Sequence, residues 1–292
     1  MKDFPSCFAE NGVAIADASC TSSTVSKSKA SQNLVTCVYQ SKFLAKSRLI
    51  IITWSKNLVG HCFSVEIEDL SHKSLSRLDV KPSLFSKTKG SKHLQVDFLT
   101  IDVYWDLTNA KFGSTPEPIQ GFYLGLAFKG QIVLLIGDLT KQILKKTGSI
   151  PIASQSFSNS LVLKREHIFG NKVYATKAQF KDNGVIHDLR IECDTVGSNN
   201  PRLVLRLDSK IVMQVKHLLW KFRGNCTISI DGLPVEVYWD VHNWLFGSTA
   251  ASAVFMFQTC YELADPSTVP WPCSQSLHCP GFCFTLYAWK NE

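Results

Sequence analysis

A twelve-residue motif occurs twice in this chain of 292 residues. The stretch that begins at Tyr104 reads YWDLTNAKFGST and the stretch that begins at Tyr238 reads YWDVHNWLFGST, which gives eight identities at an offset of 134 residues. Extended without gaps, residues 81–115 and 215–249 share 14 identities in 35 positions. A repeat of this length is typical of a duplicated structural unit. We therefore predict two similar units in tandem.

Short runs rich in valine, isoleucine, phenylalanine, tyrosine and threonine follow one another from residue 33 onward. Breaks such as Asn183-Gly184 and Asp231-Gly232 separate them, and these residue types favour tight turns. In residues 202–208 leucines alternate with other residues, which is the period of a strand. One short helix is predicted, over Leu139–Lys146.

These patterns predict an all-β fold made of two similar antiparallel units. Sandwich and barrel both consist of short, evenly spaced strands with alternating faces, so each unit could be either. A lipocalin-like pair of barrels is the alternative within this fold class.

Composition divides the chain into four parts. Residues 1–31 hold seven serines and two threonines, which favours a flexible segment over 1–32. Strand-like sequence over 33–147 predicts the first β unit, and a serine-rich stretch over 148–159 predicts a linker. The second β unit is predicted over 160–292.

The net charge of +7 is unevenly distributed along the chain. Residues 1–146 hold 18 basic against 12 acidic residues, whereas residues 147–292 hold 13 against 12. A basic surface on the first unit favours a polyanion such as an acidic lipid or RNA. The candidate polyanion-binding residues are Lys87, Lys89 and Lys92 around a glycine turn, with Lys141, Lys145 and Lys146 on the predicted helix.

The ten cysteines are scattered, and several lie within apolar strand-like runs. The first residues contain no apolar stretch typical of a signal peptide, so we expect most cysteines to be reduced and buried. The spacing of Cys273, Cys279 and Cys283 does not fit a zinc knuckle, and we predict no metal site and no cofactor. Apolar runs such as Gln131–Gly137 are too short to span a membrane, so no transmembrane segment is expected.

The repeated motif has two interpretations. Alternation places Val103 and Trp105 on one face of a strand, and Asn109 and Gly113 suit a tight turn with a positive φ, so the favoured interpretation is a structural corner. Tryptophan and tyrosine can also stack on a ligand beside an aspartate acceptor. The candidate ligand-binding residues are Tyr104, Trp105, Asp106, Tyr238, Trp239 and Asp240.

An enzyme is a further alternative, in the form of a hydrolase-like protein with a cleft between the units. The candidate acid and base groups are His167, His187, Asp188 and Glu192. On a strand, however, Asp188 and Glu192 share a face while His187 points the other way. The sequence contains no nucleophile elbow, P-loop, dinucleotide fingerprint or zinc-protease motif, so a catalytic residue cannot be assigned.

Characteristic segments are spread over nearly the whole chain. They read FPSCF at 4–8, QNLVTCVY at 32–39, TWSK at 53–56, FSKTKGSK at 85–92, KREHIFG at 164–170, KAQF at 177–180 and LYAWK at 286–290. Together with the two YWD motifs they resemble the plant family known as domain of unknown function 868. The resemblance implies a plant, intracellular protein, cytoplasmic or nuclear, and brings no activity or catalytic residue.

The repeated unit consists mainly of turn and core residues rather than titratable groups. We therefore predict a non-enzymatic binding or scaffolding protein. Its ligand would be a small apolar molecule inside a barrel-like unit, or a protein partner on its surface.

Overall fold

The computed structural model describes residues 34–43, 46–81, 88–148, 160–181, 184–193, 201–247, 252–259 and 281–290. Of these residues 68% lie in strands and 6% in helices, which confirms the all-β prediction. The predicted flexible segment 1–32 and nearly all of the predicted linker 148–159 lie outside the described residues. Within the described ranges, neither helix has the length and hydropathy that a membrane crossing requires.

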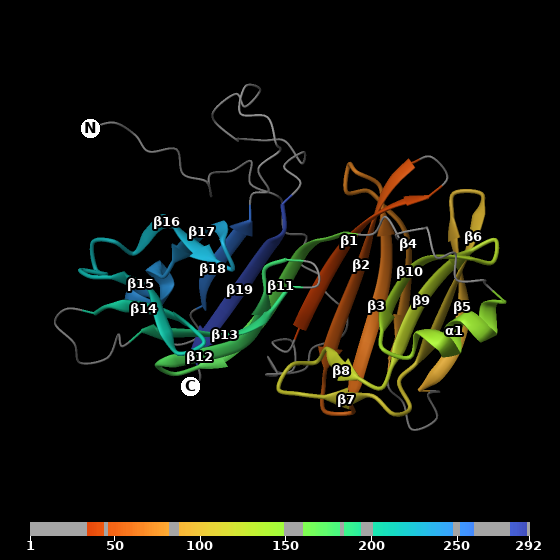
Figure 1. Cartoon of the computed structure of the whole chain (residues 1–292), viewed down its shortest axis with the longest axis horizontal. Helices are drawn as coiled ribbons and strands as arrows, with labels where there is room; N and C mark the ends of the chain where they lie inside the picture. The colour runs from red at the N-terminus through yellow and green to blue at the C-terminus, as the bar shows by residue number, and fades with distance from the viewer. Residues whose placement is uncertain are drawn as a thin grey trace.

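One nine-stranded sheet runs through the molecule (Figure 1). Its strands in spatial order are β16 (Arg223–Ile230), β17 (Leu233–Asp240), β18 (Ser252–Thr259), β19 (Cys283–Lys290), β11 (Ser160–Gly170), β1 (Leu34–Phe43), β2 (Lys46–Lys56), β3 (His61–Glu68) and β4 (Ser74–Val80). The prediction of purely antiparallel pairing is wrong at one junction, where β11 and β19 run parallel. Parallel neighbours need a long crossover, and here all the strands from β12 to β18 lie between them in the chain.

Two four-stranded sheets pack on this large sheet. The first contains β10 (Gln131–Gly137), β9 (Tyr123–Phe128), β6 (Leu99–Asp106) and β5 (Lys89–Val96), and the second contains β12 (Val173–Gln179), β13 (Ile186–Cys193), β14 (Leu203–Leu207) and β15 (Lys210–Val215). The first packs against β1 to β3 and the second against β16 to β19, so the chain forms two sandwich-like lobes side by side (Figure 1).

Each lobe is filled by its own apolar cluster. Trp54 and Phe63 are fully buried in the first lobe, and Tyr174, Phe255 and Phe257 are fully buried in the second. Large inward side chains fill the space that a barrel would need for a ligand. The described strands form no closed barrel, because each smaller sheet ends in unpaired edges. The alternative of a lipocalin-like pair of barrels is therefore wrong.

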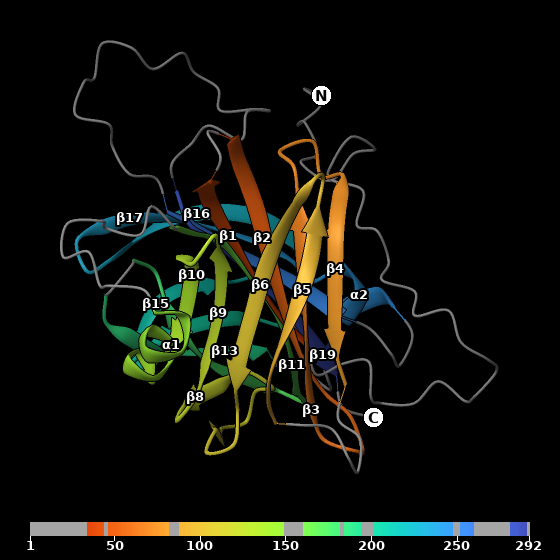
Figure 2. The same cartoon turned by 90° about the vertical axis from the view of Figure 1, so that its right-hand side faces the viewer.

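The predicted helix over 139–146 is present as α1 (Thr140–Thr147), which ends at Gly148 with a φ of 65°. Its buried residue Ile143 packs where Gly125 of β9 has no side chain, and Figure 2 shows α1 beside β9 and β10. This contact fixes the helix on the outer side of the smaller sheet.

The two copies of the repeated motif end differently. The first continues into a two-stranded arm, β7 (Lys111–Phe112) and β8 (Pro118–Gln120), whereas the second forms a short helix, α2 (His242–Phe246). Neither Asn109 nor Gly113 has a positive φ, so the predicted left-handed turn is wrong. The chain turns there because Asp106 Oδ1 accepts a hydrogen bond from the backbone N–H of Thr108 at 3.1 Å.

Candidate functional site

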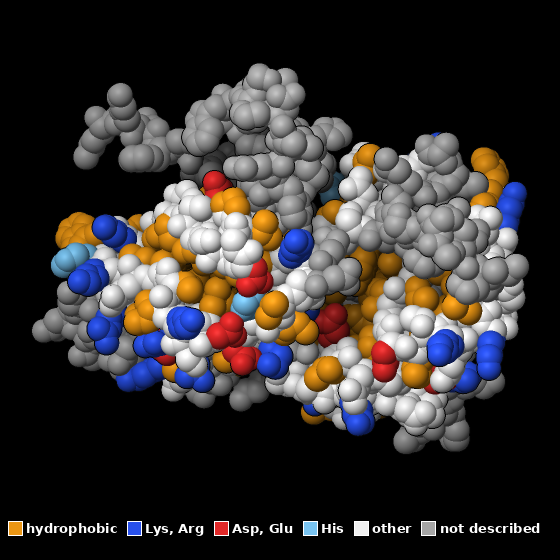
Figure 3. All heavy atoms as spheres, in the orientation of Figure 1, with side chains coloured by type: hydrophobic (Ala, Val, Ile, Leu, Met, Phe, Trp, Pro, Cys, Tyr) orange, Lys and Arg blue, Asp and Glu red, His pale blue; other side chains and the backbone are white. Residues whose placement is uncertain are grey.

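A groove of about 860 Å³ lies between the two lobes. Its floor comes from β1, β11 and β19, one wall from the arm that contains β7 and β8, and the other wall from β12 and β13. Figure 3 shows the surface hollowed between the lobes, with acidic side chains beside the hollow. The volume is within the range of about 300–1,000 Å³ that is usual for ligand sites. We call it the inter-lobe groove.

Two charged residues, Lys164 and Glu166, form the middle of the groove floor. Their cross-strand partners on β1 are Cys37 and Val35, which belong to the core of the first lobe. On β19 the neighbour of Lys164 is Phe284, which belongs to the core of the second lobe. Both lobes therefore pack on the same face of the large sheet, and between them β11 carries charges where its neighbours are apolar.

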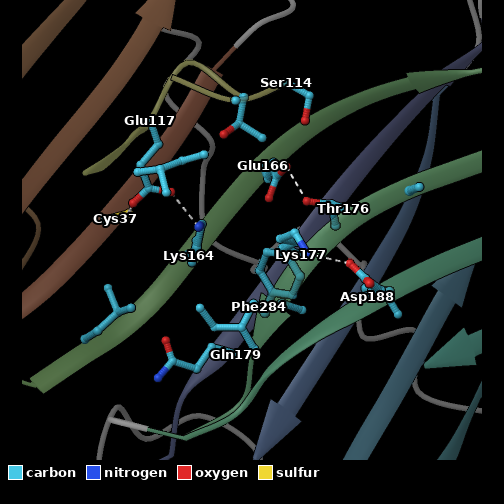
Figure 4. A pocket seen from close by; sticks show the side chains of 18 of the residues that line it. Cys37, Ser114, Glu117, Lys164, Glu166, Thr176, Lys177, Gln179, Asp188 and Phe284 are labelled. Carbon is cyan, nitrogen blue, oxygen red and sulfur yellow. Dashed lines mark hydrogen bonds and ion pairs between the residues drawn. The ribbon is translucent and has the colours of Figure 1, made fainter. Parts of the chain in front are cut away.

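Lys164 forms an ion pair with a residue of the arm. Its Nζ lies 2.6 Å from Glu117 Oε2, and the two side chains are 22% and 26% exposed (Figure 4). Burial alone would lower the pKa of Lys164, but the negative charges of Glu117 and Glu166 outweigh it and raise that pKa. The ammonium group is therefore charged at neutral pH and positioned by Glu117.

Cys37 lies beside this ion pair. Its Sγ donates to Glu117 Oε1 at 3.7 Å, and burial, together with the charge of Glu117, raises the pKa of the thiol well above its usual value. A thiol with a raised pKa stays protonated and is a poor nucleophile. The surroundings of Cys37 therefore do not activate its thiol as a nucleophile.

Glu166 is the most buried polar group of the groove, with a residue exposure of 1%. Its Oε1 accepts a hydrogen bond from Thr176 Oγ1 of β12 at 2.6 Å, which Figure 4 shows across the floor of the pocket. Burial raises the pKa of this carboxyl group, although Lys164 and Thr176 act in the opposite direction. A buried carboxylate is costly to folding, so its presence here needs a reason beyond packing.

The arm that carries Glu117 is anchored at several points. Phe112 stacks on His61 of β3 with ring centroids 3.6 Å apart. At the end of the arm, the backbone N–H of Gly121 donates to Asp138 Oδ1 at 2.7 Å. Gly121 has a φ of 77°, in the left-handed region that glycine adopts readily. These contacts hold the arm over the floor, so Glu117 reaches Lys164.

The repeated Tyr-Trp-Asp residues lie at the ends of β6 and β17. A Cβ atom added to Gly90 would lie 2.6 Å from Trp105 Cζ2, and one added to Gly224 would lie 2.4 Å from Trp239 Cζ2. In both lobes a tryptophan ring thus covers a glycine of the neighbouring strand.

The aspartates of the two motifs also have matching contacts. Asp106 pairs with Lys89 and Asp240 pairs with Arg223, each at 2.7 Å. The backbone N–H two residues further on, at Thr108 and at His242, donates to the same aspartate. These contacts favour the structural interpretation. None of the six candidate ligand-binding residues lines the inter-lobe groove, and ligand binding by them stays a prediction: Tyr104, Trp105, Asp106, Tyr238, Trp239 and Asp240.

The four candidate acid and base residues do not meet in one pocket. His187 lies between Asp208 and Asp231, with ring nitrogens 2.6 and 2.9 Å from their carboxylates. His167 stacks on Tyr287 and accepts a hydrogen bond from Trp289 Nε1 at 3.1 Å.

Of the other two candidates, Asp188 pairs with Lys177 at the rim of the groove, and Glu192 pairs with Arg206 outside it. Since only Asp188 lines the groove, the four residues do not form a catalytic centre there.

The basic candidate residues of the first unit differ in their contacts. Lys87 lies outside the described residues, and Lys89 is paired with Asp106. Lys92 is opposite Val103, so it shares the inward side of β5, whereas Lys89 is on the outward side. The helix residues Lys141, Lys145 and Lys146 are exposed, and the ammonium group of Lys146 lies 5.0 Å from the Tyr104 ring centroid. Polyanion binding stays a prediction.

No cluster of three or more histidine, cysteine or acidic residues suited to a metal occurs in the part of the chain that the structure describes. Cys273 and Cys279 fall outside that part, and Cys283 is a free thiol on β19.

Sequence reasoning did not select the residues of the groove floor. The signal for them is the alternation within β11, where Lys164 and Glu166 share a face with the buried Ile168. Charged residues at the inward positions of a central strand indicate a polar site between the lobes. No sequence signal identified Glu117, because its position depends on the path of the arm.

The family model described as "Plant protein of unknown function (DUF868)" matches residues 30–290. No curated protein and no solved structure matches the chain. The matched range contains both lobes and the inter-lobe groove.

Proposed function

The chain belongs to a plant family of unknown function, and we propose that it is a non-enzymatic binding protein whose inter-lobe groove holds the ligand. The observation that carries this proposal is the pair Lys164 and Glu166, which occupies core-facing positions on the floor of the groove. Apolar residues at these two positions would join the two cores and avoid the cost of burying charges. Ligand recognition accounts for polar groups in a place where folding favours apolar ones.

The polar groups of the floor match a ligand that both donates and accepts hydrogen bonds. Lys164 offers donors, and Glu117 offers acceptors 2.6 Å away. Leu161, Ile119 and Phe284 add apolar surface around them. Sites with mostly apolar walls and a few placed polar groups are usual for ligands of intermediate polarity. A small molecule that carries an amide and an apolar substituent has this chemistry.

A binding role is favoured over catalysis by the way the groove residues pair with one another. Lys164 is held by Glu117, and Lys177 is held by Asp188. The raised pKa of Cys37 keeps the thiol protonated. A nucleophile needs an adjacent base that activates it, and these pairings do not provide one.

Binding can be tested by saturation-transfer difference NMR with a library of small amides and capped peptides. Replacement of both members of the ion pair, in Lys164→Met with Glu117→Leu, removes the donor and the acceptor together and leaves Glu166 with its hydrogen bond from Thr176. A matched control is Arg206→Met with Glu192→Leu, which removes a partly exposed ion pair outside the groove. We expect saturable binding by the wild type and the control, with a loss of at least tenfold in the groove variant. Equal binding by all three proteins would contradict the proposal.

We also propose that the two lobes arose by tandem duplication and correspond to 33–147 and 160–292, joined by 148–159. The hairpins β5–β6 and β16–β17 support this, because Gly90 is opposite Trp105 and Gly224 is opposite Trp239. The turn residues Asp97 and Asp231 also share a positive φ, of 54° and 51°.

An intracellular location, cytoplasmic or nuclear, is part of the proposal. It is supported by the free thiols of the five described cysteines. Imaging of a fluorescent fusion in plant cells would test it, and secretion of the fusion would contradict it.

A further inference from the structure

Strand β12 is an edge strand that borders the inter-lobe groove. It pairs with β13 on one side, and no described strand pairs with its other side. An edge strand presents unpaired backbone N–H and C=O groups, and a further strand can pair with them. The free side of β12 is therefore a row of backbone donors and acceptors within reach of the groove.

The groove follows this free edge. Five consecutive residues of β12, Ala175 to Gln179, line it. Successive side chains of a strand point to opposite faces, so a cavity against one face would touch only every second residue. Contact with all five places the cavity along the backbone edge. Figure 4 shows Thr176, Lys177 and Gln179 on the same side of the pocket.

The facing wall leaves room beside β12. It contains three consecutive arm residues with small side chains, Gly113, Ser114 and Thr115, followed by the larger Glu117, Pro118 and Ile119. Neighbouring strands of a sheet lie about 4.7–4.9 Å apart, so a strand paired with β12 would occupy the groove next to this wall.

We infer that the groove takes an extended peptide segment of a partner protein, which pairs with β12 as a fifth strand of the smaller sheet of the second lobe. The inference rests on the proposed function and names its ligand class. Addition of a peptide strand to an exposed sheet edge is a common mode of recognition, in which backbone hydrogen bonds supply affinity and side-chain pockets supply specificity. The five lining residues span about 17 Å at about 3.4 Å per residue, which suits a segment of five or six residues.

The floor and the rim of the groove set different demands on the peptide side chains. On the floor, Leu161 and Phe284 are apolar, whereas Lys164, together with Glu117 of the arm, suits the C=O and N–H of a peptide group. The rim is basic. Its charged residues are Lys177, Lys181, Arg190 and Asp188.

Alternate residues of a bound strand face the floor and the rim in turn. The partner segment therefore alternates apolar and acidic side chains.

The first experiment compares two capped hexapeptides, one alternating valine with glutamate and one alternating valine with lysine. Binding to the full chain is measured by isothermal titration calorimetry. We expect the glutamate peptide to bind at least tenfold more tightly, because its acidic side chains meet the basic rim. Equal affinity, or tighter binding of the lysine peptide, would overturn the predicted side-chain pattern.

The second experiment tests the strand pairing itself. Each amide of the glutamate peptide is N-methylated in turn, which removes one donor at a time. Antiparallel strands exchange hydrogen bonds through alternate residues, and parallel strands also use alternate residues of each chain. We expect losses of tenfold or more at every second position, with losses below about twofold at the positions between. Equal sensitivity at all positions would overturn strand addition.

A protein variant locates the binding. Ala175→Trp places a large side chain inside the groove beside β12, and Ile211→Trp places one on β15, the other edge strand of the same sheet. Both original residues are exposed, so both variants are expected to fold, which circular dichroism and urea unfolding check. Only Ala175→Trp should abolish peptide binding. Unchanged binding in a folded Ala175→Trp variant would overturn the placement on β12.

A library of small amides separates this inference from the proposed function. Groove-dependent binding of small amides without any binding of the glutamate peptide would overturn the peptide inference and leave the proposed function supported. If neither amides nor peptides bind, both are overturned.

Discussion

Asp231 Oδ2 lies 2.9 Å from His187 Nε2, a contact that ties the turn between β16 and β17 to the smaller sheet of the second lobe. Asp97, at the equivalent position of the first repeat, lies 2.7 Å from the guanidinium group of Arg48 on β2. Both aspartates are turn residues with a positive φ, and both partners are buried. In each lobe, the turn of the repeated hairpin thus contacts the opposite sheet through an aspartate carboxylate that pairs with a buried basic side chain.

The contacts of His187 predict a pH-dependent stability. Burial lowers the pKa of His187, but hydrogen bonds to Asp208 and Asp231 outweigh it and raise the pKa. A raised folded-state pKa contributes stability that is complete below the unfolded value of about 6.5 and is lost as the pH rises through the folded value. In His187→Gln, we expect this loss above about pH 6.5 to disappear, and the free energy of unfolding at pH 6 to fall by about 1.5–3 kcal/mol. Urea unfolding at several pH values measures both effects.

The control for this variant is His72→Gln, which changes a half-exposed histidine at a turn. Its pH profile should follow that of the wild type. A His187→Gln variant that retains the full loss of stability between pH 6.5 and pH 9 would show that another group causes the pH dependence.

The glycines under the two tryptophan rings predict a second stability effect. A Cβ atom at residue 224 would lie 2.4 Å from Trp239 Cζ2, so Gly224→Ala forces the buried ring to move. Overpacking of this kind costs about 1–3 kcal/mol, and the same range applies to Gly90→Ala under Trp105. Urea unfolding measures the loss. Asn225→Ala, at the exposed neighbouring position, should change the stability by less than about 0.5 kcal/mol, and an equal effect of both changes would contradict the packing argument.

Local features of this fold follow directly from sequence patterns. The helix at 139–146 differs from the observed α1 by one residue at each end, because Gly148 ends it in the left-handed conformation. The alternation at Val103 and Trp105 places both in the core, as expected. Such features depend on neighbours in the sequence, so the residues themselves determine them.

The pairing of sheets could not be predicted in the same way. Cys37 and Lys164 are cross-strand partners although 127 residues separate them, and alternation within a strand does not reveal which strand lies beside it. The contact of Lys164 with Glu117 depends on that pairing and on the path of the arm. The helix α2 was missed because five residues are too few to show a helical period.

The ion pair on the groove floor predicts strong coupling between its two members. Lys164→Met leaves Glu117 and Glu166 without their cation, and Glu117→Leu leaves Lys164 without its closest anion. For this partly buried pair we expect each single change to lower the free energy of unfolding by about 1–3 kcal/mol, and the double change to recover most of that loss.

A double-mutant cycle measured by urea unfolding gives the coupling energy. The control is the exposed pair Lys177 and Asp188, whose side chains are 72% and 71% exposed. Its single changes should cost less than about 0.5 kcal/mol, as is usual for surface ion pairs. Additive effects at Lys164 and Glu117 would show that the pair does not act as a unit.

Replacement of Glu166 is expected to give a variant that is more stable than the wild type. Burial raises the pKa of this carboxyl group despite the opposing effects of Lys164 and Thr176, so the folded protein disfavours its ionised form. Because the folded-state pKa is raised, the wild type loses stability as the pH rises from about 4.5, where the unfolded chain begins to ionise, through the folded value. Glu166→Gln keeps an acceptor oxygen for Thr176 Oγ1 and removes the ionisation.

The variant should therefore match the wild type near pH 4 and exceed its free energy of unfolding at pH 7.5, which urea unfolding at the two pH values measures. Glu192→Gln, which changes a partly exposed acid paired with Arg206, should give no such gain. A residue whose replacement stabilises the fold is retained for a purpose other than folding, which for Glu166 is the ligand site of the inter-lobe groove. If Glu166→Gln is instead less stable than the wild type at pH 7.5, the carboxylate is part of the structural support of the floor, which would contradict its retention for a ligand.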